Sequence, residues 1–443
     1  MAAKQQWTSK LGFILAAAGS AIGLGAIWKF PYMAGANGGG VFFLLFILFT
    51  VLIGAPILLA EFIIGRKAGA DAITSYKKLA PNSYWHLIGY LGTIVSFIIL
   101  SFYSVVGGWI LSYLWRSVTG SLSGDTQEGY AALFDSVISN PWEVLIAQGV
   151  FMVMTIMVVQ GGVQKGIERA SRYMMPSLFI LFFVLVIRAL TLDGAMEGVR
   201  FLLLPDWTQL TGKTVLLAMG QAFFALTVGL SVMVTYASYL PKDDSMPKSA
   251  ISVSGLNILI SLLAGLVIFP AVYALGFQPD QGPGIAFVVL PAVFNEMAFG
   301  GLFFTIFLVL LLFATLTSAF SILEIGVAGL SKGASTKRVK FSWMVGILAF
   351  VAGIPSALSF GVLGDIKIAG LNFFDFADNI TSNFGLPIGA LLISIFIGYR
   401  LKKEDVWDEV RLGSSISRGV FNAWMLLIRI IVPVAILLIL ITN

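Results

Sequence analysis

Two short segments of this chain have residue types and spacing that leave backbone groups free to bind ligands. The first, Gly19-Ser-Ala-Ile-Gly23-Leu-Gly25, has three glycines in seven residues. The second, Phe223–Ser231, reads Phe-Phe-Ala-Leu-Thr-Val-Gly-Leu-Ser. Because a glycine costs about 1 kcal/mol relative to alanine in a helix, both segments predict a break in helical structure. Free N–H groups bind anions and free carbonyls bind cations, so a zwitterion together with a metal cation would satisfy both.

Small residues also have a purely structural explanation, because they let membrane helices pack closely. That explanation suffices for Gly107-Gly108 and for many of the 47 glycines in the chain. Whether the two segments serve close packing or ligand binding depends on the helices in which they lie.

The composition indicates an all-α polytopic membrane protein. Of 443 residues, 58% are hydrophobic and 11% are charged, with a mean hydropathy of +0.95. A soluble domain has about 25% charged residues. Apolar segments of about 20 residues, the length that crosses the hydrocarbon of a bilayer as a helix, recur along the chain. The lipid bilayer is therefore an expected partner.

About eleven transmembrane helices are predicted, and a further apolar stretch at 284–298 is too short to cross and reads as a helical loop. The predicted spans are 9–34, 40–68, 84–117, 142–160, 166–188, 212–240, 249–276, 300–331, 340–360, 372–399 and 419–441.

The basic residues predict the orientation. With the N-terminus in the cytoplasm, most of the 27 Lys and Arg residues fall on the inner side, as the positive-inside rule requires. Eleven spans then place the C-terminus outside a cytoplasmic membrane. Because the net charge of +5 follows this topology, we expect no nucleic acid partner.

The two glycine-containing segments occupy equivalent positions in the span order. One lies in the first span and the other in the sixth, so that residues 9–190 and 212–400 form two sets of five spans. Two such sets, each starting with a weakened helix, are typical of a transporter with inverted repeats. We therefore predict a single transporter domain over 1–443, a 5+5 inverted repeat with helices 1 and 6 broken at the midplane, and an additional span at 419–441.

The chain lacks the residues that other membrane functions need. It has no cysteine and one histidine, His86, and it contains no HExxH motif and no paired intramembrane aspartates. This composition excludes thiol chemistry and disfavours an intramembrane enzyme, so no catalytic residue is predicted. A channel is disfavoured because no ring of charges would line a pore.

Four ordered motifs resemble the neurotransmitter:sodium symporter family, which has the leucine-transporter fold. They are Gly23–Tyr32 (GLGAIWKFPY), Asn37–Gly40 (NGGG), Gly220–Phe224 (GQAFF) and Thr235–Tyr239 (TYASY), and the similarity extends from about residue 4 to residue 400. The resemblance implies sodium-coupled symport by alternating access. The expected substrates are neutral hydrophobic L-amino acids such as Leu, Ile, Val, Phe and Trp.

The resemblance also implies a substrate site. The carboxylate would meet the amides of Leu24 and Gly25 and the Tyr103 hydroxyl. The ammonium would meet the carbonyls of Ala21, Phe224 and Ala225 and the Thr227 hydroxyl. The remaining expected site residues, most of them around the substrate side chain, are Ile99, Leu230, Ser318, Ala319 and Ile322.

Two sodium sites are implied in the same way. The ligands of the site called Na2 would be the Gly19, Ile22 and Ala314 carbonyls and the Thr317 and Ser318 hydroxyls. Those of Na1 would be the Ala21 and Ala225 carbonyls and the Asn257 side chain, with the substrate carboxylate. Na1 departs from the family pattern, because Ala26 and Ala225 stand where family members usually have side-chain oxygens. Water, a shifted ligand or a weak site are the open alternatives.

Chloride coupling is doubtful, because Phe46 and Ala225 lack the hydroxyls of the animal chloride site and Ser261 supplies no carboxylate. A proton-coupled carrier of the same fold is the nearest alternative to sodium coupling. Such a carrier would need a protonatable group near Thr317, and none is apparent.

The family pattern further predicts gates at both ends of the site. Lys29 and Asp378 match an outer ion pair, and Lys4, Trp7 and Tyr239 match an inner gate whose usual acidic partner is missing near Ser331-Lys332. Glu61 is expected to brace the first broken helix. The segment from Gly166 to Pro176 is expected to loosen and admit water during inward opening.

Overall fold

The computed structural model spans residues 1–443 and describes residues 6–122, 124, 126–277, 282–332 and 334–442. Within these ranges the chain forms helices and no strand, apart from the isolated bridges Gly39↔Pro205 and Ile368↔Leu371. The predicted all-α class is therefore confirmed.

The α-helices are α1 Lys10–Ala21, α2 Phe30–Ala36, α3 Gly40–Phe49, α4 Ala55–Ala68, α5 Ala72–Leu79, α6 Leu87–Thr119, α7 Gln127–Ser139, α8 Pro141–Val159, α9 Arg169–Leu190, α10 Ala195–Leu203, α11 Gly212–Leu226, α12 Val232–Ala237, α13 Met246–Ala274, α14 Val289–Asn295, α15 Gly300–Ser331, α16 Ser335–Leu358, α17 Phe373–Asn379, α18 Leu386–Ile395, α19 Lys403–Arg411, α20 Arg418–Leu426 and α21 Val432–Thr442. The π-helical segments are η1 Gly25–Lys29, η2 Thr50–Gly54, η4 Val163–Glu168, η7 Ile380–Gly385, η8 Phe396–Arg400 and η9 Leu427–Ile431, and the 3₁₀ segments are η3 Tyr84–His86, η5 Trp207–Gln209 and η6 Gly282–Ala286.

Nine helices of the described chain are long and apolar enough to cross a membrane, and they correspond to nine of the predicted spans. A tenth span is the bent pair Lys10–Ala21 and Gly25–Ala36. The predicted sixth span, 212–240, is divided into α11 and α12, and each part alone is too short to cross. The predicted short loop helix at 284–298 is present as η6 and α14.

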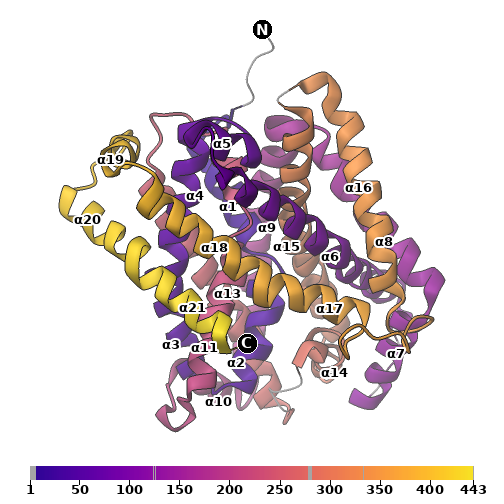
Figure 1. Ribbon diagram of the computed structural model, residues 1–443. Helices are drawn as coiled ribbons and strands as arrows, with labels where there is room; N and C mark the ends of the chain where they lie inside the picture. Colours follow the sequence, from indigo (N-terminus) through magenta and orange to yellow (C-terminus); the bar gives the residue numbers. More distant parts are fainter. Residues whose placement is uncertain (1–5, 123, 125, 278–281, 333, 443) are drawn as a thin grey trace.

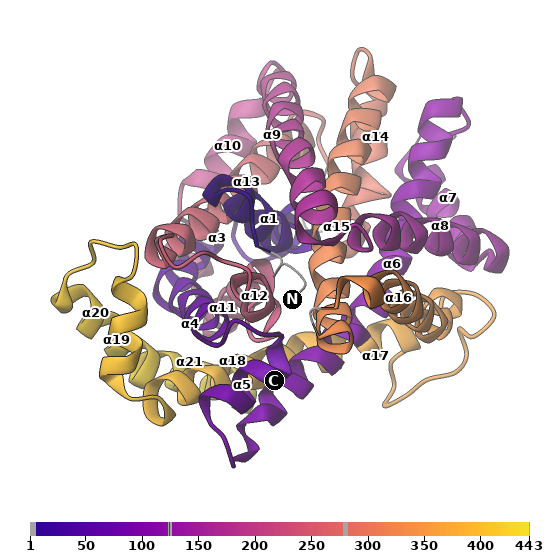
Figure 2. The same ribbon diagram turned by 90° about the horizontal axis from the view of Figure 1, so that it is seen from above.

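The helices form a bundle (Figure 1), and its interior is filled with buried apolar side chains. In the view from above, α1, α11 and α12 lie inside the ring formed by the longer helices (Figure 2). Helix α1 packs against α9, α13 and α15, and α12 packs against α4 and α15. The most apolar stretch of α15 is 83% buried, whereas that of the α20–α21 span is 28% buried. The outer helices therefore present their apolar side chains to lipid, and α15 forms part of the core.

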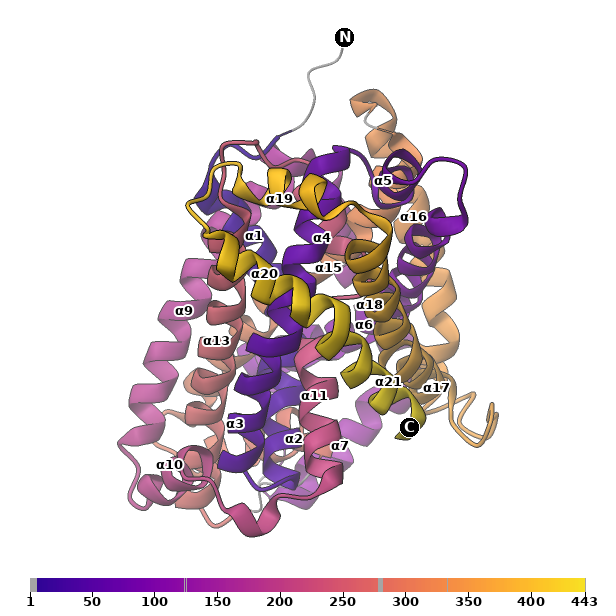
Figure 3. The same cartoon turned by 60° about the vertical axis from the view of Figure 1, so that its left-hand side comes forward.

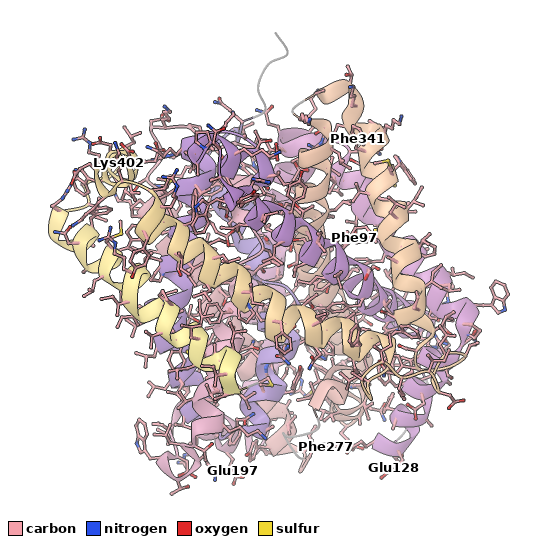
Figure 4. All side chains as sticks on the ribbon, viewed as in Figure 1. Phe97, Glu128, Glu197, Phe277, Phe341 and Lys402 are labelled. Atoms are coloured by element: carbon pink, nitrogen blue, oxygen red, sulfur yellow. The ribbon has the colours of Figure 1, made fainter. Side chains whose placement is uncertain are left out.

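The loops separate to two ends of the bundle. Helices α5 and α19 lie at one end and α7 and α10 at the other, with α1 beginning at the first end and α21 ending toward the second (Figure 3). Lys402 and Phe341 lie near the first end, whereas Glu197, Glu128 and Phe277 lie near the second (Figure 4). The first end carries the basic loops that the sequence analysis assigns to the cytoplasm, and we refer to it as the inner end.

Both predicted helix breaks are present. Helix α1 ends at Ala21, and η1 with α2 continues at an angle of 52° to it. The second break separates α11 from α12, and there Thr227, Gly229 and Ser231 have φ values of +54°, +93° and +58°. Such left-handed backbone ends a right-handed helix. Helices 1 and 6 are thus broken as predicted, while the repeat boundaries 9–190 and 212–400 remain a prediction.

Candidate functional site

A small cavity of about 30 Å³ lies between the two breaks, so its walls are close together in this structure. All the expected substrate residues line it except Ala225 and Ala319, which are fully buried in packed surroundings. Three further lining residues were not expected. The complete lining is Ser20, Ala21, Gly23, Leu24, Gly25, Ile99, Tyr103, Phe224, Thr227, Leu230, Ser318, Ile322 and Leu386.

One part of this cavity is polar because it is built from broken backbone. The Leu24 amide donates to the Tyr103 hydroxyl at 3.2 Å. The Ser20 carbonyl accepts hydrogen bonds from the hydroxyls of Thr227 at 3.2 Å and Ser318 at 3.0 Å. A side chain at Gly23 would collide with this group, since an added Cβ would lie 2.3 Å from the Ser318 Oγ. Amide donors and carbonyl acceptors together match the two charged groups of an amino acid.

The remaining wall is apolar. It includes Ile99 of α6, Ile322 of α15, Leu386 of α18 and Leu230, which lies in the break between α11 and α12. No charged side chain of the described residues lines the cavity. A charged or strongly polar ligand side chain would lose its hydration here without a partner.

The expected Na2 ligands come together beside the first break. The Thr317 hydroxyl lies 3.0 Å from both the Gly19 and the Ala314 carbonyl oxygens. The Ser318 hydroxyl lies 3.1 Å from the Gly19 carbonyl. Ile22 directly follows α1, where the last carbonyls of a helix lack intrahelical partners. All of these ligands are uncharged oxygens, and oxygen is the ligand atom that hard cations prefer.

The expected Na1 residues also meet. The Asn257 Nδ2 donates to the Ala21 carbonyl at 3.1 Å and to the Ala225 carbonyl at 2.8 Å, and its Oδ1 is buried without a hydrogen-bond partner. If the Asn257 amide were flipped, its Oδ1 would point at the same two carbonyl oxygens. Three oxygens repel one another, so this arrangement would be stable only with a cation bound between them. Ala26 is fully buried and supplies no side-chain oxygen. Among the described residues, no cluster of His, Cys, Asp and Glu could hold a multivalent metal ion.

A vestibule of about 220 Å³ adjoins the central cavity. Leu24, Tyr103 and Phe224 line both spaces and therefore lie between them. Lys29 and Asp378, the expected outer pair, both line the vestibule but lie more than 4.0 Å apart. The Lys29 ammonium instead lies 4.2 Å from the centre of the Phe224 ring, a cation–π distance.

The inner end is closed. Trp7, 3% exposed, donates from its backbone to the Tyr239 carbonyl at 3.2 Å and from its indole to the Tyr236 carbonyl at 2.9 Å. The Tyr239 hydroxyl donates to Glu324 at 3.0 Å, and Glu324 forms a buried ion pair with Arg338. Lys4, the other expected gate residue, lies outside the described residues.

The sequence predicts no acidic partner for the inner gate at Ser331-Lys332, but Glu324 contacts the expected gate residue Tyr239. Glu324 lies about two helical turns before Ser331-Lys332 and accepts a hydrogen bond from the Tyr239 hydroxyl. The sequence does mark Glu324, because it is the one acidic residue in the predicted span 300–331. Acidic residues within a membrane span are usually functional.

The prediction that Glu61 braces the first broken helix is wrong. Its fully buried carboxylate accepts from the amides of Gly229 at 2.7 Å and Met233 at 3.2 Å, and it therefore braces the second break rather than the first. The positive φ at Gly229 exposes these amides, and a buried amide must find an acceptor. Glu168, which was not expected, holds the start of α1 by accepting from the Thr8 amide at 2.9 Å.

The fifth span is helical from Val163 to Leu190 with Pro176 inside it. Its first turns, η4, have π-helical geometry, which is common at functional sites. An added Cβ at Gly166 would lie 2.0 Å from the Val158 carbonyl oxygen, so this glycine is needed for close packing. Loosening of this segment remains a prediction.

Comparison with known proteins identifies the family. The chain matches the sodium:neurotransmitter symporter family over residues 4–131 and 128–443. It belongs to this family. Relatives of this sodium:neurotransmitter symporter include the uncharacterized sodium-dependent transporter YhdH of Bacillus subtilis, 57% identical over 98% of this chain and 96% of the relative. An uncharacterized sodium-dependent transporter of Haemophilus influenzae is 35% identical over 99% of this chain and 98% of its own length.

A solved structure has the same fold. The crystal structure of MhsT in complex with L-phenylalanine matches with a TM-score of 0.91 and 45% sequence identity, over 99% of both chains. The chain is thus a multi-pass, sodium-dependent membrane transporter with the leucine-transporter fold, and it is not an enzyme.

Proposed function

We propose that this protein imports neutral hydrophobic L-amino acids, such as Leu, Ile, Val, Phe and Trp, together with Na⁺. The observation that carries the proposal is the central cavity, where amides and carbonyls of two broken helices adjoin an uncharged apolar wall. An amino acid zwitterion satisfies the polar groups, and a hydrophobic side chain suits the wall. The relative MhsT, whose structure contains L-phenylalanine, supports the same substrate class.

The two oxygen clusters at Gly19–Thr317–Ser318 and at Ala21–Ala225–Asn257 would bind two sodium ions, with the substrate carboxylate completing the second. Neither cluster contains a fixed charge, so the bound ions are held by dipoles alone. An ion held in this way can leave when the inner end opens. No feature of the chloride position argues for a bound anion, since Phe46 and Ala225 offer no hydroxyl.

Transport would proceed by alternating access in a cytoplasmic membrane, with the N-terminus inside and the C-terminus outside. The vestibule beside the central cavity and the packed inner end support this proposal, because an outward-facing state of the cycle would need both. Approach of Lys29 and Asp378 would close the vestibule, and separation of Trp7 from Tyr236 and Tyr239 would open the inner path.

The test is uptake of radiolabelled leucine and tryptophan into proteoliposomes, with an inward gradient of sodium compared with one of potassium. Saturable uptake with sodium alone is expected, and the Hill slope for sodium tests whether both ion sites are used. Equal uptake in the two salts would refute sodium coupling and favour the proton-coupled alternative. Competition by charged amino acids as strong as that by leucine would refute the substrate class.

A further inference from the structure

Leu386 is the part of the central cavity that comes from the tenth predicted span. It is the first residue of α18 and is 2% exposed. It lines the cavity together with Ile99, Leu230 and Ile322, so an apolar substrate side chain bound there would contact it. Neither its local sequence nor its position beyond the two glycine-containing segments marks it as a site residue.

The backbone around Leu386 is fixed against the second helix break. An added Cβ at Gly229 would lie 2.3 Å from the Leu386 carbonyl oxygen, and one at Gly389 would lie 2.0 Å from the Gly229 carbonyl oxygen. The two backbones are therefore in direct contact with no side chain between them. The backbone of Leu386 therefore cannot move away from a bulky ligand unless α18 or the break also moves.

An apolar wall that cannot move limits the size of the substrate side chain that can bind against it. Packed interiors tolerate added atoms poorly, and deleting buried carbons leaves a space that the surroundings fill only in part. The side chain at position 386 thus determines how much volume remains for the substrate side chain.

We propose that Leu386 is a specificity-determining residue that sets the upper size of the transported amino acid side chain. This inference rests on the proposed function, because it assumes that the substrate side chain occupies the apolar part of the cavity. A smaller residue favours tryptophan over leucine, and a larger residue excludes tryptophan while sparing valine and alanine.

The experiment measures inhibition of labelled leucine uptake by alanine, valine, leucine, phenylalanine and tryptophan. We expect Leu386→Ala to shift the ratio of the tryptophan to the leucine inhibition constant about tenfold or more toward tryptophan, since small differences in apolar fit are worth about 10- to 200-fold. Leu386→Phe is expected to shift the same ratio in the opposite direction. Leu386→Val provides a milder change of the first kind if the alanine variant does not fold.

Leu392→Ala is the matched control. It makes the same deletion in the same helix at a partly buried position that does not line the cavity. We expect this variant to keep the wild-type order of the five amino acids. Loss of uptake by an equal factor for all five in the Leu386 variants would overturn the inference, because a packing role reduces transport without reordering substrates.

The outcomes separate the two proposals. Wild-type protein without sodium-dependent uptake of any hydrophobic amino acid would contradict the proposed function itself. Normal wild-type uptake, with an unchanged substrate order in the Leu386→Val and Leu386→Phe variants, would contradict the role of Leu386 alone.

Discussion

Removal of the Thr317 hydroxyl tests the proposed Na2 site. This oxygen lies 3.0 Å from the Gly19 and Ala314 carbonyls, so it bridges α1 and α15 where the ion would bind. In the ion-free protein, Thr317→Ala leaves Gly19 with a second donor, the Ser318 hydroxyl at 3.1 Å. We therefore expect a small effect on folding and a large effect on sodium binding.

The magnitude follows from the loss of one ligand. A polar contact to a charged group is worth about 1.5–3 kcal/mol, and about 1.4 kcal/mol corresponds to a factor of ten in affinity. Thr317→Ala should thus raise the half-saturating sodium concentration for uptake about 10- to 150-fold. Thr317→Ser keeps the oxygen and should remain close to wild type.

Thr155→Ala is the control for this measurement. Thr155 is fully buried and its hydroxyl donates to the Phe151 carbonyl four residues earlier, at 2.9 Å. Thr317 makes the equivalent bond to the Phe313 carbonyl at 3.1 Å, so both variants lose the same helical bond. An unchanged sodium dependence in Thr317→Ala, or an equal change in Thr155→Ala, would refute the assignment of Na2.

Three further predictions concern the buried polar groups. Glu61→Gln replaces one of the two oxygens that accept from the amides of the second break with an NH₂ donor. The free energy of unfolding should fall by about 1–3 kcal/mol, which is measured as a lower thermal unfolding temperature together with loss of substrate binding. Arg338→Gln removes the counter-ion of the buried Glu324 carboxylate, which keeps only its hydrogen bond from Tyr239, and loss of one partner of a buried ion pair costs about 3–5 kcal/mol. Hydrogen exchange at the inner end should rise, and Glu324→Gln in the same protein should reverse part of the rise. Tyr103→Phe should weaken substrate binding about 10-fold or more, as measured by a scintillation proximity assay. The control Tyr113→Phe removes a buried hydroxyl that has no hydrogen-bond partner, and it should leave substrate binding unchanged. Equal effects of the two variants would refute the contact between Tyr103 and the substrate carboxylate.

Local composition was sufficient to predict the helix breaks. Glycine lowers the stability of helical backbone wherever it occurs, and the two glycine-containing segments therefore predicted breaks within a few residues of those observed. The apolar spans were predicted for a similar reason, since their length must match the bilayer. The positions of the cavity residues in helices 1 and 6 followed from these breaks and from the family motifs.

The partners of buried groups could not be predicted in this way. Glu61 is 168 residues from Gly229 in the sequence, and no local pattern indicates which of two breaks lies beside it. Tyr239 and Glu324 are 85 residues apart, and no local pattern indicates that these two side chains meet. Each such pairing depends on how helices are rotated and offset against one another.

The sequence by itself thus determined the membrane class, the order of the spans and the places where helices 1 and 6 break, because these depend on the local cost of burying or bending backbone. The tertiary structure alone decided that Leu386 lines the cavity, that Glu61 braces the second break and that Glu324 accepts a hydrogen bond from Tyr239. The physical reason is that helices packed in a membrane meet through shape and hydrogen bonding across long sequence separations. Those contacts exist only when the whole bundle has assembled.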